Sequence, residues 1–249
     1  MKNIEIIVLT VALFLMSPVM ANEVKDERID TYLNILSSAS MEKQKTMLNR
    51  LQWSGLSDPR LFDVIEKSLM DQHLERNLSN KQLAVLAYMT RSLGYSGNEK
   101  YRSTISTLSQ DAFSPKIKRH AGKALRDMNN FSTWNALVKN NDLNVEGKNA
   151  AITTYMKMLD VDDVFVQRLA ARAMFHEQLR DPDLLALAAN KLESMYLQSG
   201  LDGESQDTAA WLCKAIGQSG QSKYINLLAE VTSKTPYNKI RKYARKYSR

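Results

Sequence analysis

Few residues in this 249-residue chain have the types and spacing that catalysis or metal binding requires. The three histidines, His73, His120 and His176, are far apart, and none has a second ligand at the spacing of a zinc or calcium site. The single cysteine, Cys213, lies in the apolar stretch AAWLCKAIG, so we expect a small buried side chain and not a reactive thiol. We therefore predict no metal, no cofactor and no catalytic residue.

Serine and glycine adjoin each other in two places, as Tyr-Ser-Gly at 95–97 and Gln-Ser-Gly at 218–220. A serine nucleophile on a strand-to-helix turn needs the pattern G-x-S-x-G, and here the glycine follows the serine directly. The phosphate-binding pattern GxxxxGK[ST] does not occur either. The sequence thus predicts that the protein is not an enzyme.

Positive charge is the most uneven feature of the chain, whose formal net charge is +7. The last residues, TPYNKIRKYARKYSR, contain six Lys or Arg and no acid. A second run, SPKIKRHAGKALR, begins at Ser114 and contains five Lys or Arg and no acid. Both runs are candidate binding sites for an acidic protein, phospholipid headgroups or an anionic cell-wall polymer.

These runs have a simpler interpretation as solvated helix faces. Terminal units of a stacked helical protein need a polar outer face, and cations near the end of a helix complement its dipole. Charged runs are usually solvated faces of this kind, which favours the simpler interpretation. Both interpretations remain open at this point.

The first residues, MKNIEIIVLTVALFLMSPVMANE, have the pattern of a secretory signal peptide. We predict a signal peptide at 1–21, with cleavage after Ala21. Its apolar run is shorter than the ~20 residues that a membrane-spanning helix needs, and Pro18 follows it. The protein is therefore expected to be periplasmic or secreted, where a nucleic-acid partner is not expected.

The elements that must position the charged residues are predicted to be helices. Helix-forming residues dominate, with only nine glycines and five prolines, and no stretch alternates between apolar and polar residues as a strand would. One cysteine cannot form an internal disulfide, so the fold must depend on its apolar core. We predict that 22–249 form a single all-α unit.

An internal duplication organises this unit. The peptide LGYSGNEKY starting at Leu93 recurs as IGQSGQSKY starting at Ile216, 123 positions later. The same shift aligns Asp58-Pro59 with Asp181-Pro182 without any gap. An internal repeat of this kind determines the fold. We predict a first half at 26–128, a join at 129–150 and a second half at 151–249.

Start and stop signals divide each half into six helices, which we expect to form three antiparallel pairs. The two Asp-Pro dipeptides predict an N-cap followed by proline in the first turn. Gly94 and Gly217 are expected to be the left-handed residues that end a helix. A short additional helix is predicted at Trp134 to Val138, within the join.

Several stretches are similar to HEAT repeats. VDDVFVQRLAARAMFHEQLRDPDLLALAANKL, from Val161 to Leu192, resembles one unit, and SPKIKRHAGKALRDM, from Ser114 to Met128, resembles part of another. A period of 123 residues shared by three pairs gives about 41 residues per pair, within the ~40–47 of HEAT and armadillo repeats. The resemblance, to HEAT-repeat proteins of an exported bacterial type, implies an α–α superhelix of about six helix pairs that binds other macromolecules.

The second helix of each pair is expected to line the concave face of such a superhelix. Our predicted contact residues are the cations on these helices: Lys118, Arg119, Lys123, Arg168, Lys214, Arg241, Lys242, Arg245 and Lys246. The leading hypothesis is a non-catalytic scaffold or adaptor that binds a protein partner in the cell envelope. One alternative is adsorption to anionic lipid or wall polymer through the basic helices. Another is a lyase-like enzyme, because some HEAT-like proteins resemble phycobilisome lyases, although no residue here marks such a site.

Overall fold

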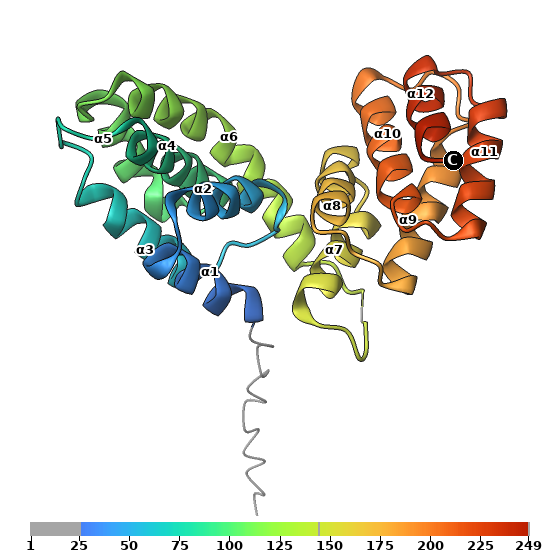
Figure 1. Cartoon of the computed structure of the whole chain (residues 1–249), viewed down its shortest axis with the longest axis horizontal. Helices are drawn as coiled ribbons and strands as arrows, with labels where there is room; N and C mark the ends of the chain where they lie inside the picture. Colours follow the sequence, from blue (N-terminus) through green and yellow to red (C-terminus); the bar gives the residue numbers. More distant parts are fainter. Residues whose placement is uncertain (1–25, 144, 249) are drawn as a thin grey trace, which may run out of the picture.

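The structure, a computed structural model, describes residues 26–143 and 145–248, and all the regular elements in this part of the chain are helices (Figure 1). The predicted all-α fold is therefore confirmed. The predicted signal peptide at 1–21 and its cleavage site lie outside the described residues. No helix of the described part is both long and apolar enough to cross a membrane.

Each half contains six α-helices. Those of the first half are α1 (Glu27–Ser38), α2 (Met41–Arg50), α3 (Pro59–Met70), α4 (Asn80–Tyr95), α5 (Arg102–Asp111) and α6 (Pro115–Lys139), with the short 3-10 helices η1 (Leu51–Trp53) and η2 (Glu99–Tyr101). Those of the second half are α7 (Ala150–Asp160), α8 (Val164–His176), α9 (Pro182–Met195), α10 (Gly203–Gly217), α11 (Ser222–Lys234) and α12 (Asn238–Tyr247).

The duplication is visible in where these helices begin. The first and last pairs of equivalent helices begin at 27 and 150 and at 115 and 238, in each case 123 residues apart. The same spacing holds for every pair between them, with η2 forming the first turn opposite α11. The predicted six helices per half are confirmed, as are the Asp58 and Asp181 caps, whose carboxylates accept hydrogen bonds from backbone amides of the first turn.

Each half is built of two layers. In the inner layer α2 packs on α4 and α4 on α6, and equally α8 packs on α10 and α10 on α12. The odd-numbered helices form the outer layer, each packed on its even-numbered partner. Buried apolar side chains between the layers form the core, which includes Cys213; burial raises the pKa of this thiol to about 12. The predicted inert cysteine is thus confirmed as a buried side chain.

Two pairs of glycines explain why one peptide occurs twice, although not as we predicted. The left-handed residues are Gly97 and Gly220, with φ of +62° and +69°. Gly94 instead lies inside α4, and Gly217 is the last residue of α10. Neither has a positive φ, so the left-handed conformation predicted for both was wrong, although α10 does end at Gly217. A Cβ atom would lie 2.8 Å from a carbonyl oxygen of α6 at Gly94, and 2.5 Å from a side-chain carbon of α12 at Gly217. These glycines therefore allow the inner helices to approach closely.

The last helix of the first half is longer than predicted. α6 continues without a break from Pro115 to Lys139, so the separate helix predicted at Trp134 to Val138 does not exist. The physical reason is that buried Met128, Phe131 and Val138 extend the apolar stripe of α6, and no proline or glycine interrupts it there. The extra turns carry α6 out of the first half and towards the second.

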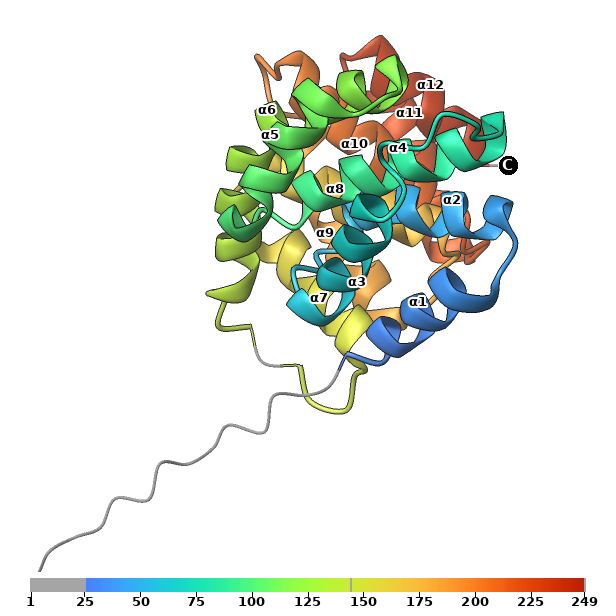
Figure 2. The same ribbon diagram turned by 90° about the vertical axis from the view of Figure 1, so that its left-hand side faces the viewer.

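The two halves meet at the end of the inner layer of the first half, and they diverge from there as two arms (Figure 1). Seen from the side of the first half, α1 to α6 lie in front of the second half (Figure 2). η1 packs against α8, and the Trp53 indole stacks on the His176 ring with centroids 4.9 Å apart. Trp134 of α6 stacks on Phe165 of α8, with centroids 4.0 Å apart. Two stacked pairs of rings thus join the arms.

A buried polar network joins the halves on the side of α1. The Arg28 guanidinium donates hydrogen bonds to the Ser54 carbonyl oxygen at 2.9 Å and to the Tyr155 hydroxyl at 3.1 Å. The Tyr155 hydroxyl in turn donates to the Glu177 carboxylate at 3.0 Å. Burial raises the pKa of Glu177, although the Tyr155 hydroxyl and the charge of Arg28 act in the opposite direction.

Candidate binding surface between the two arms

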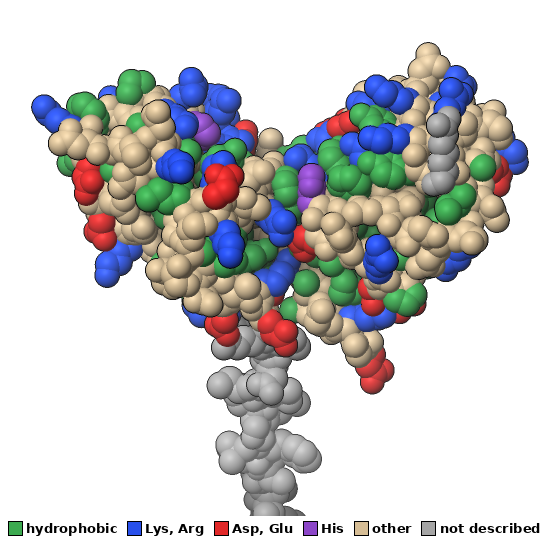
Figure 3. Space-filling view, viewed as in Figure 1, with side chains coloured by type: hydrophobic (Ala, Val, Ile, Leu, Met, Phe, Trp, Pro, Cys, Tyr) green, Lys and Arg blue, Asp and Glu red, His purple; other side chains and the backbone are tan. Residues whose placement is uncertain are grey.

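A hollow separates the first arm (α1 to α6) from the second (α7 to α12), and Lys and Arg side chains gather on both of its flanks (Figure 3). The inner-layer helices α8, α10 and α12 lie on the side of the second arm that faces the first (Figure 1). These inner-layer helices of the second arm form one wall of the hollow (Figure 1).

One group of rings and cations lies on α10 and α12, and we call it the second-arm cluster. It consists of Trp211, Lys214, Lys242, Tyr243 and Lys246. The Lys214 ammonium lies 3.4 Å from the centroid of the Trp211 ring and 4.4 Å from that of Tyr243. Lys242 lies over Tyr243 as well, at 5.8 Å. Cations over ring faces are attracted by the quadrupole of the ring.

The positive charge of this cluster is only partly compensated. Lys214 makes no ion pair within 4.0 Å with a described residue. Burial lowers the pKa of Lys214, and the charges of Lys246 and Arg172 lower it further, while Asp207 acts in the opposite direction. Asp207 is itself engaged with Lys239 at 2.8 Å and with Arg168. An anion placed at Lys214 would relieve the mutual repulsion of these cations.

A matching group lies on α4 and α6, and we call it the first-arm cluster. It consists of Tyr88, Arg91, Arg119, His120 and Lys123. The Tyr88 and His120 rings meet edge to face, with centroids 6.3 Å apart. Burial lowers the pKa of His120, and the charges of Arg91, Arg119 and Lys123 lower it further. Arg91 is paired with Asp127, whereas Arg119 and Lys123 are exposed.

The two clusters occupy the same positions of the duplicated unit. A shift of 123 residues aligns each member of the first-arm cluster with one of the second-arm cluster: Tyr88 with Trp211, Arg91 with Lys214, Arg119 with Lys242, His120 with Tyr243 and Lys123 with Lys246. Rings align with rings and cations with cations. Each arm therefore carries the same combination of groups at equivalent positions of its inner-layer helices.

The floor of the hollow connects the clusters. The Arg91 Nε donates a hydrogen bond to the Tyr95 hydroxyl at 3.1 Å. The Arg172 guanidinium lies 4.7 Å from the centroid of Trp53 and 5.4 Å from that of Trp211. Rings and guanidinium groups thus continue from one arm to the other.

Several nitrogens along this route are buried without a hydrogen-bond partner among the described residues. They are Trp53 Nε1, Arg91 Nη1, His120 Nδ1 and Arg172 Nε. A buried donor without a hydrogen-bond partner lowers the stability of the fold, so such groups are few in folded proteins.

Of the nine predicted contact residues, five lie in the clusters: Arg119, Lys123, Lys214, Lys242 and Lys246. Arg245 is exposed on α12 outside the cluster. The other three have partners within the molecule. Arg168 pairs with Glu204 at 2.9 Å, Arg241 donates to the Thr235 carbonyl oxygen at 2.5 Å, and Lys118 donates to a carbonyl oxygen at the end of α5.

Sequence reasoning missed several members of this surface: Trp53, Tyr88, Arg91, Arg172, His176, Trp211 and Tyr243. The duplication contained a usable signal for four of them, because Tyr88 aligns with Trp211 and His120 with Tyr243, while Arg91 aligns with the predicted Lys214. Trp53 aligns with His176 in the same way, ring with ring. No comparable signal existed for Arg172, which aligns with Asn49 and meets Trp53 only because α8 packs on η1.

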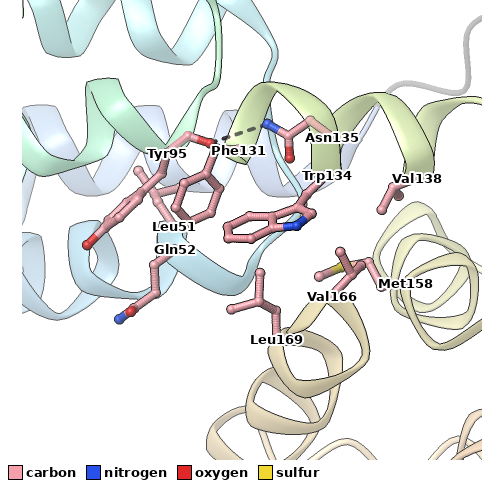
Figure 4. Close-up of a pocket in the computed structure, with 11 residues that line it drawn as sticks. Leu51, Gln52, Tyr95, Phe131, Trp134, Asn135, Val138, Met158, Val166 and Leu169 are labelled. Carbon is pink, nitrogen blue, oxygen red and sulfur yellow. Dashed lines mark hydrogen bonds between the residues drawn. The ribbon is translucent and has the colours of Figure 1, made fainter. Parts of the chain in front are cut away.

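Two other depressions offer fewer groups that could bind a ligand. A cavity of about 10 Å³ at the junction of the arms, lined by Tyr95, Phe131 and Trp134 among others, has room for about one water molecule (Figure 4). A broad depression of about 1330 Å³ involves the segments around 55–60, 96–99 and 132–157. Its Lys148 is already paired with Asp181 and Asp183.

The described residues contain no group of three or more His, Cys, Asp or Glu that could hold a metal ion. What the hollow offers is a set of fixed cations beside ring faces. Such a surface attracts anions electrostatically and provides flat apolar contacts next to each charge. Carboxylate-bearing chains fit this combination.

Comparisons with known proteins add little to this geometry. No family model and no curated protein matches the chain. One solved structure that resembles it is human deoxyhypusine hydroxylase in complex with glycerol, at 11% sequence identity and a TM-score of 0.35, over 88% of this chain and 82% of that one. No role of any residue is transferred from it. That structure is of an enzyme, which contradicts our prediction that the chain is not an enzyme, and the prediction is withdrawn.

Proposed function

We propose that the protein is an exported HEAT-like solenoid that binds an acidic segment of a partner protein in the hollow between its arms, within the cell envelope. The observation that carries this proposal is the pair of equivalent cation and ring clusters facing one hollow. Stacked helix pairs in general provide extended concave binding surfaces. Complementary charge on a partner would speed its association and favour its binding over that of other proteins.

The types of residue in the hollow favour a protein partner. Trp, Tyr and Arg are the residues most enriched among those that dominate the energy of protein interfaces. Trp211, Tyr243, Tyr88 and Arg91 provide all three types on two facing walls. Because the rings are half-buried and held by neighbouring cations, they would lose little side-chain freedom on binding.

Export is supported by the position of the folded unit relative to the predicted cleavage site. The first described helix, α1, begins at Glu27 with Asp26 as its N-cap, shortly after the predicted cleavage at Ala21. A mature chain starting at Asn22 would therefore retain every described helix. The intact mass of the protein recovered from the envelope fraction tests this part of the proposal.

Charge reversal in the hollow tests the binding function. The variant Arg91→Glu with Lys214→Glu should lose a protein partner that co-purifies with the native chain from the envelope. The matched control is Lys67→Glu with Lys191→Glu, on the outer-layer helices α3 and α9, and it should retain the partner. Equal recovery with both double variants would contradict the proposal.

One observation favours a second candidate, adsorption to anionic lipid or wall polymer. Lys242, Arg245 and Lys246 of α12 are exposed and make no ion pair with a described residue. Cosedimentation with anionic vesicles or wall fragments at low salt, lost at high salt, would support this candidate. The absence of cosedimentation at low salt would exclude it.

A further inference from the structure

We infer that the first-arm and second-arm clusters are two equivalent subsites for a single acidic chain, which bridges the hollow from one arm to the other. This inference rests on the proposed function and specifies how the partner is held. Its chemistry is that of an extended peptide segment with carboxylates near both of its ends.

Each cluster contains both the rings and the cations that one end of an acidic chain would contact. In both arms a ring and a cation of the fourth helix face a ring and two cations of the sixth: Trp211 and Lys214 face Tyr243 in the second arm. In the first arm Tyr88 faces His120. Carboxylates of the ligand would lie against the cations, and the intervening backbone and methylene groups against the rings.

The acidic residues beside the clusters, among those that the structure describes, are neutralised by ion pairs with arginine. Three carboxylates make ion pairs with arginines of the inner-layer helices: Asp127, Asp207 and Glu204. Asp127 is paired with Arg91, and the other two are paired with Arg168. Arg91 donates to the Tyr95 hydroxyl in the first arm, and Arg172 lies between Trp53 and Trp211 where the arms meet. An acidic chain can therefore lie across the hollow without meeting a repulsive group.

Occupying both clusters with one chain increases its affinity. Once one end of such a chain is bound, its other end is held near the second cluster at a high effective concentration, and the overall affinity can exceed that of either site by roughly 10² to 10⁴. The gain requires a chain long enough to reach, at ~3.3 Å per extended residue. Chain length is therefore the variable that distinguishes one bridging ligand from two independent ones.

The test uses the whole protein and two oligoglutamate peptides, one of about 2 residues, which extends to only ~7 Å, and one of about 30 residues, which extends to ~100 Å. NMR signals report each cluster separately: the indole N–H of Trp211 for the second arm and the ring protons of His120 for the first. The decisive variant is Lys214→Gln, read at His120 in the other arm. Arg91→Gln, read at Trp211, is the reciprocal variant and serves if Lys214→Gln does not fold.

With the long peptide, Lys214→Gln should raise the Kd measured at His120 at least about tenfold. With the short peptide, or in the outer-layer control Lys67→Gln, the Kd at His120 should change less than about twofold. A long-peptide Kd at His120 that is indifferent to Lys214→Gln would overturn the inference, as would the absence of any shift with either peptide. Shifts with phosphatidylglycerol vesicles and none with oligoglutamate would equally overturn it. Because no cellular partner is needed, a failure here is distinguishable from a failure to recover a partner from the envelope.

Discussion

The ammonium group of Lys214 lies 3.4 Å from the centroid of the Trp211 indole, and Arg91 and Tyr88 occupy the same two positions of the first half. The guanidinium of Arg91 pairs with the Asp127 carboxylate and donates a hydrogen bond to the Tyr95 hydroxyl. The ammonium of Lys214 lies over the Trp211 ring. The duplicated positions have thus kept a cation and a ring while their local contacts have diverged. This relationship leads to a prediction for each of the features that support the hollow.

Truncation of the indole should weaken binding, and a smaller ring should preserve it. Trp211→Ala removes a ring face between cations and is expected to weaken binding of the long oligoglutamate about tenfold, as interface rings commonly do. Trp211→Tyr should retain most of the affinity, because Tyr88 performs the equivalent role in the first arm. Titration calorimetry measures both variants. Equal affinities for the alanine and tyrosine variants would show that the ring is not used.

Close approach of α10 and α12 makes Gly217 sensitive to substitution. Gly217→Ala places a Cβ 2.5 Å from the Cβ of Tyr247 and should lower the free energy of unfolding by roughly 1–3 kcal/mol. Gly203→Ala is the matched control, because a Cβ there meets no atom within 4 Å. Urea denaturation measures the two variants. A Gly217 variant as stable as the control would show that the helices can separate without cost.

The hydroxyl of Tyr155 should matter more to stability than that of Tyr224. Tyr155→Phe leaves Arg28 and Glu177 without their shared partner and is expected to lower the free energy of unfolding by about 1–3 kcal/mol. The Tyr224 hydroxyl is buried with no hydrogen-bond partner among the described residues, so Tyr224→Phe should change stability by no more than ~0.5 kcal/mol. The reverse ranking in urea denaturation would contradict the role of Tyr155 as a link between the halves.

Acidification should destabilise the protein through two histidines of the hollow. Burial lowers the pKa of His120 and His176 in the folded state, and cations of the hollow lower it further, whereas an unfolded histidine has a pKa of about 6.5. Below that pH the unfolded chain binds more protons than the folded one, so the free energy of unfolding decreases as the pH falls.

The double variant His120→Gln with His176→Gln should remove part of this decrease. Urea denaturation between about pH 8 and pH 5 measures it, and the slope for the double variant should be shallower than that of the native chain. Parallel curves for the two proteins would indicate that neither histidine titrates abnormally.

Much of the fold could be predicted from the sequence because its local signals agree with the duplication. The Asp-Pro caps and the repeated Ser-Gly turn fix where helices begin and end, and the 123-residue period orders them. The error at Gly94 arose because a helix-ending glycine and a close-approach glycine look alike in one sequence. The length of α6 was missed because Trp134, in its last turns, stacks on Phe165 of the second half and not on a residue of its own half outside α6.

The binding surface could be predicted only in part. Runs of cations identified α6 and α12, but which of those cations are free depends on partners distant in sequence. Arg168 is neutralised by Glu204 and Asp207, 36 and 39 residues further on. Trp53 and Arg172 come together only when the halves pack. Contacts of this kind leave no trace in local spacing.

Site-specific photocrosslinking in cells tests the central claim most directly. A photoreactive phenylalanine analogue replaces Tyr88 in the first arm or Tyr243 in the second, and Leu197, which is 57% exposed beyond the outer-layer helix α9, serves as the control position. The account predicts that Tyr88 and Tyr243 capture the same protein through one acidic segment and that Leu197 captures none of it. Capture of that protein at Leu197, with nothing captured at either position in the hollow, would contradict it.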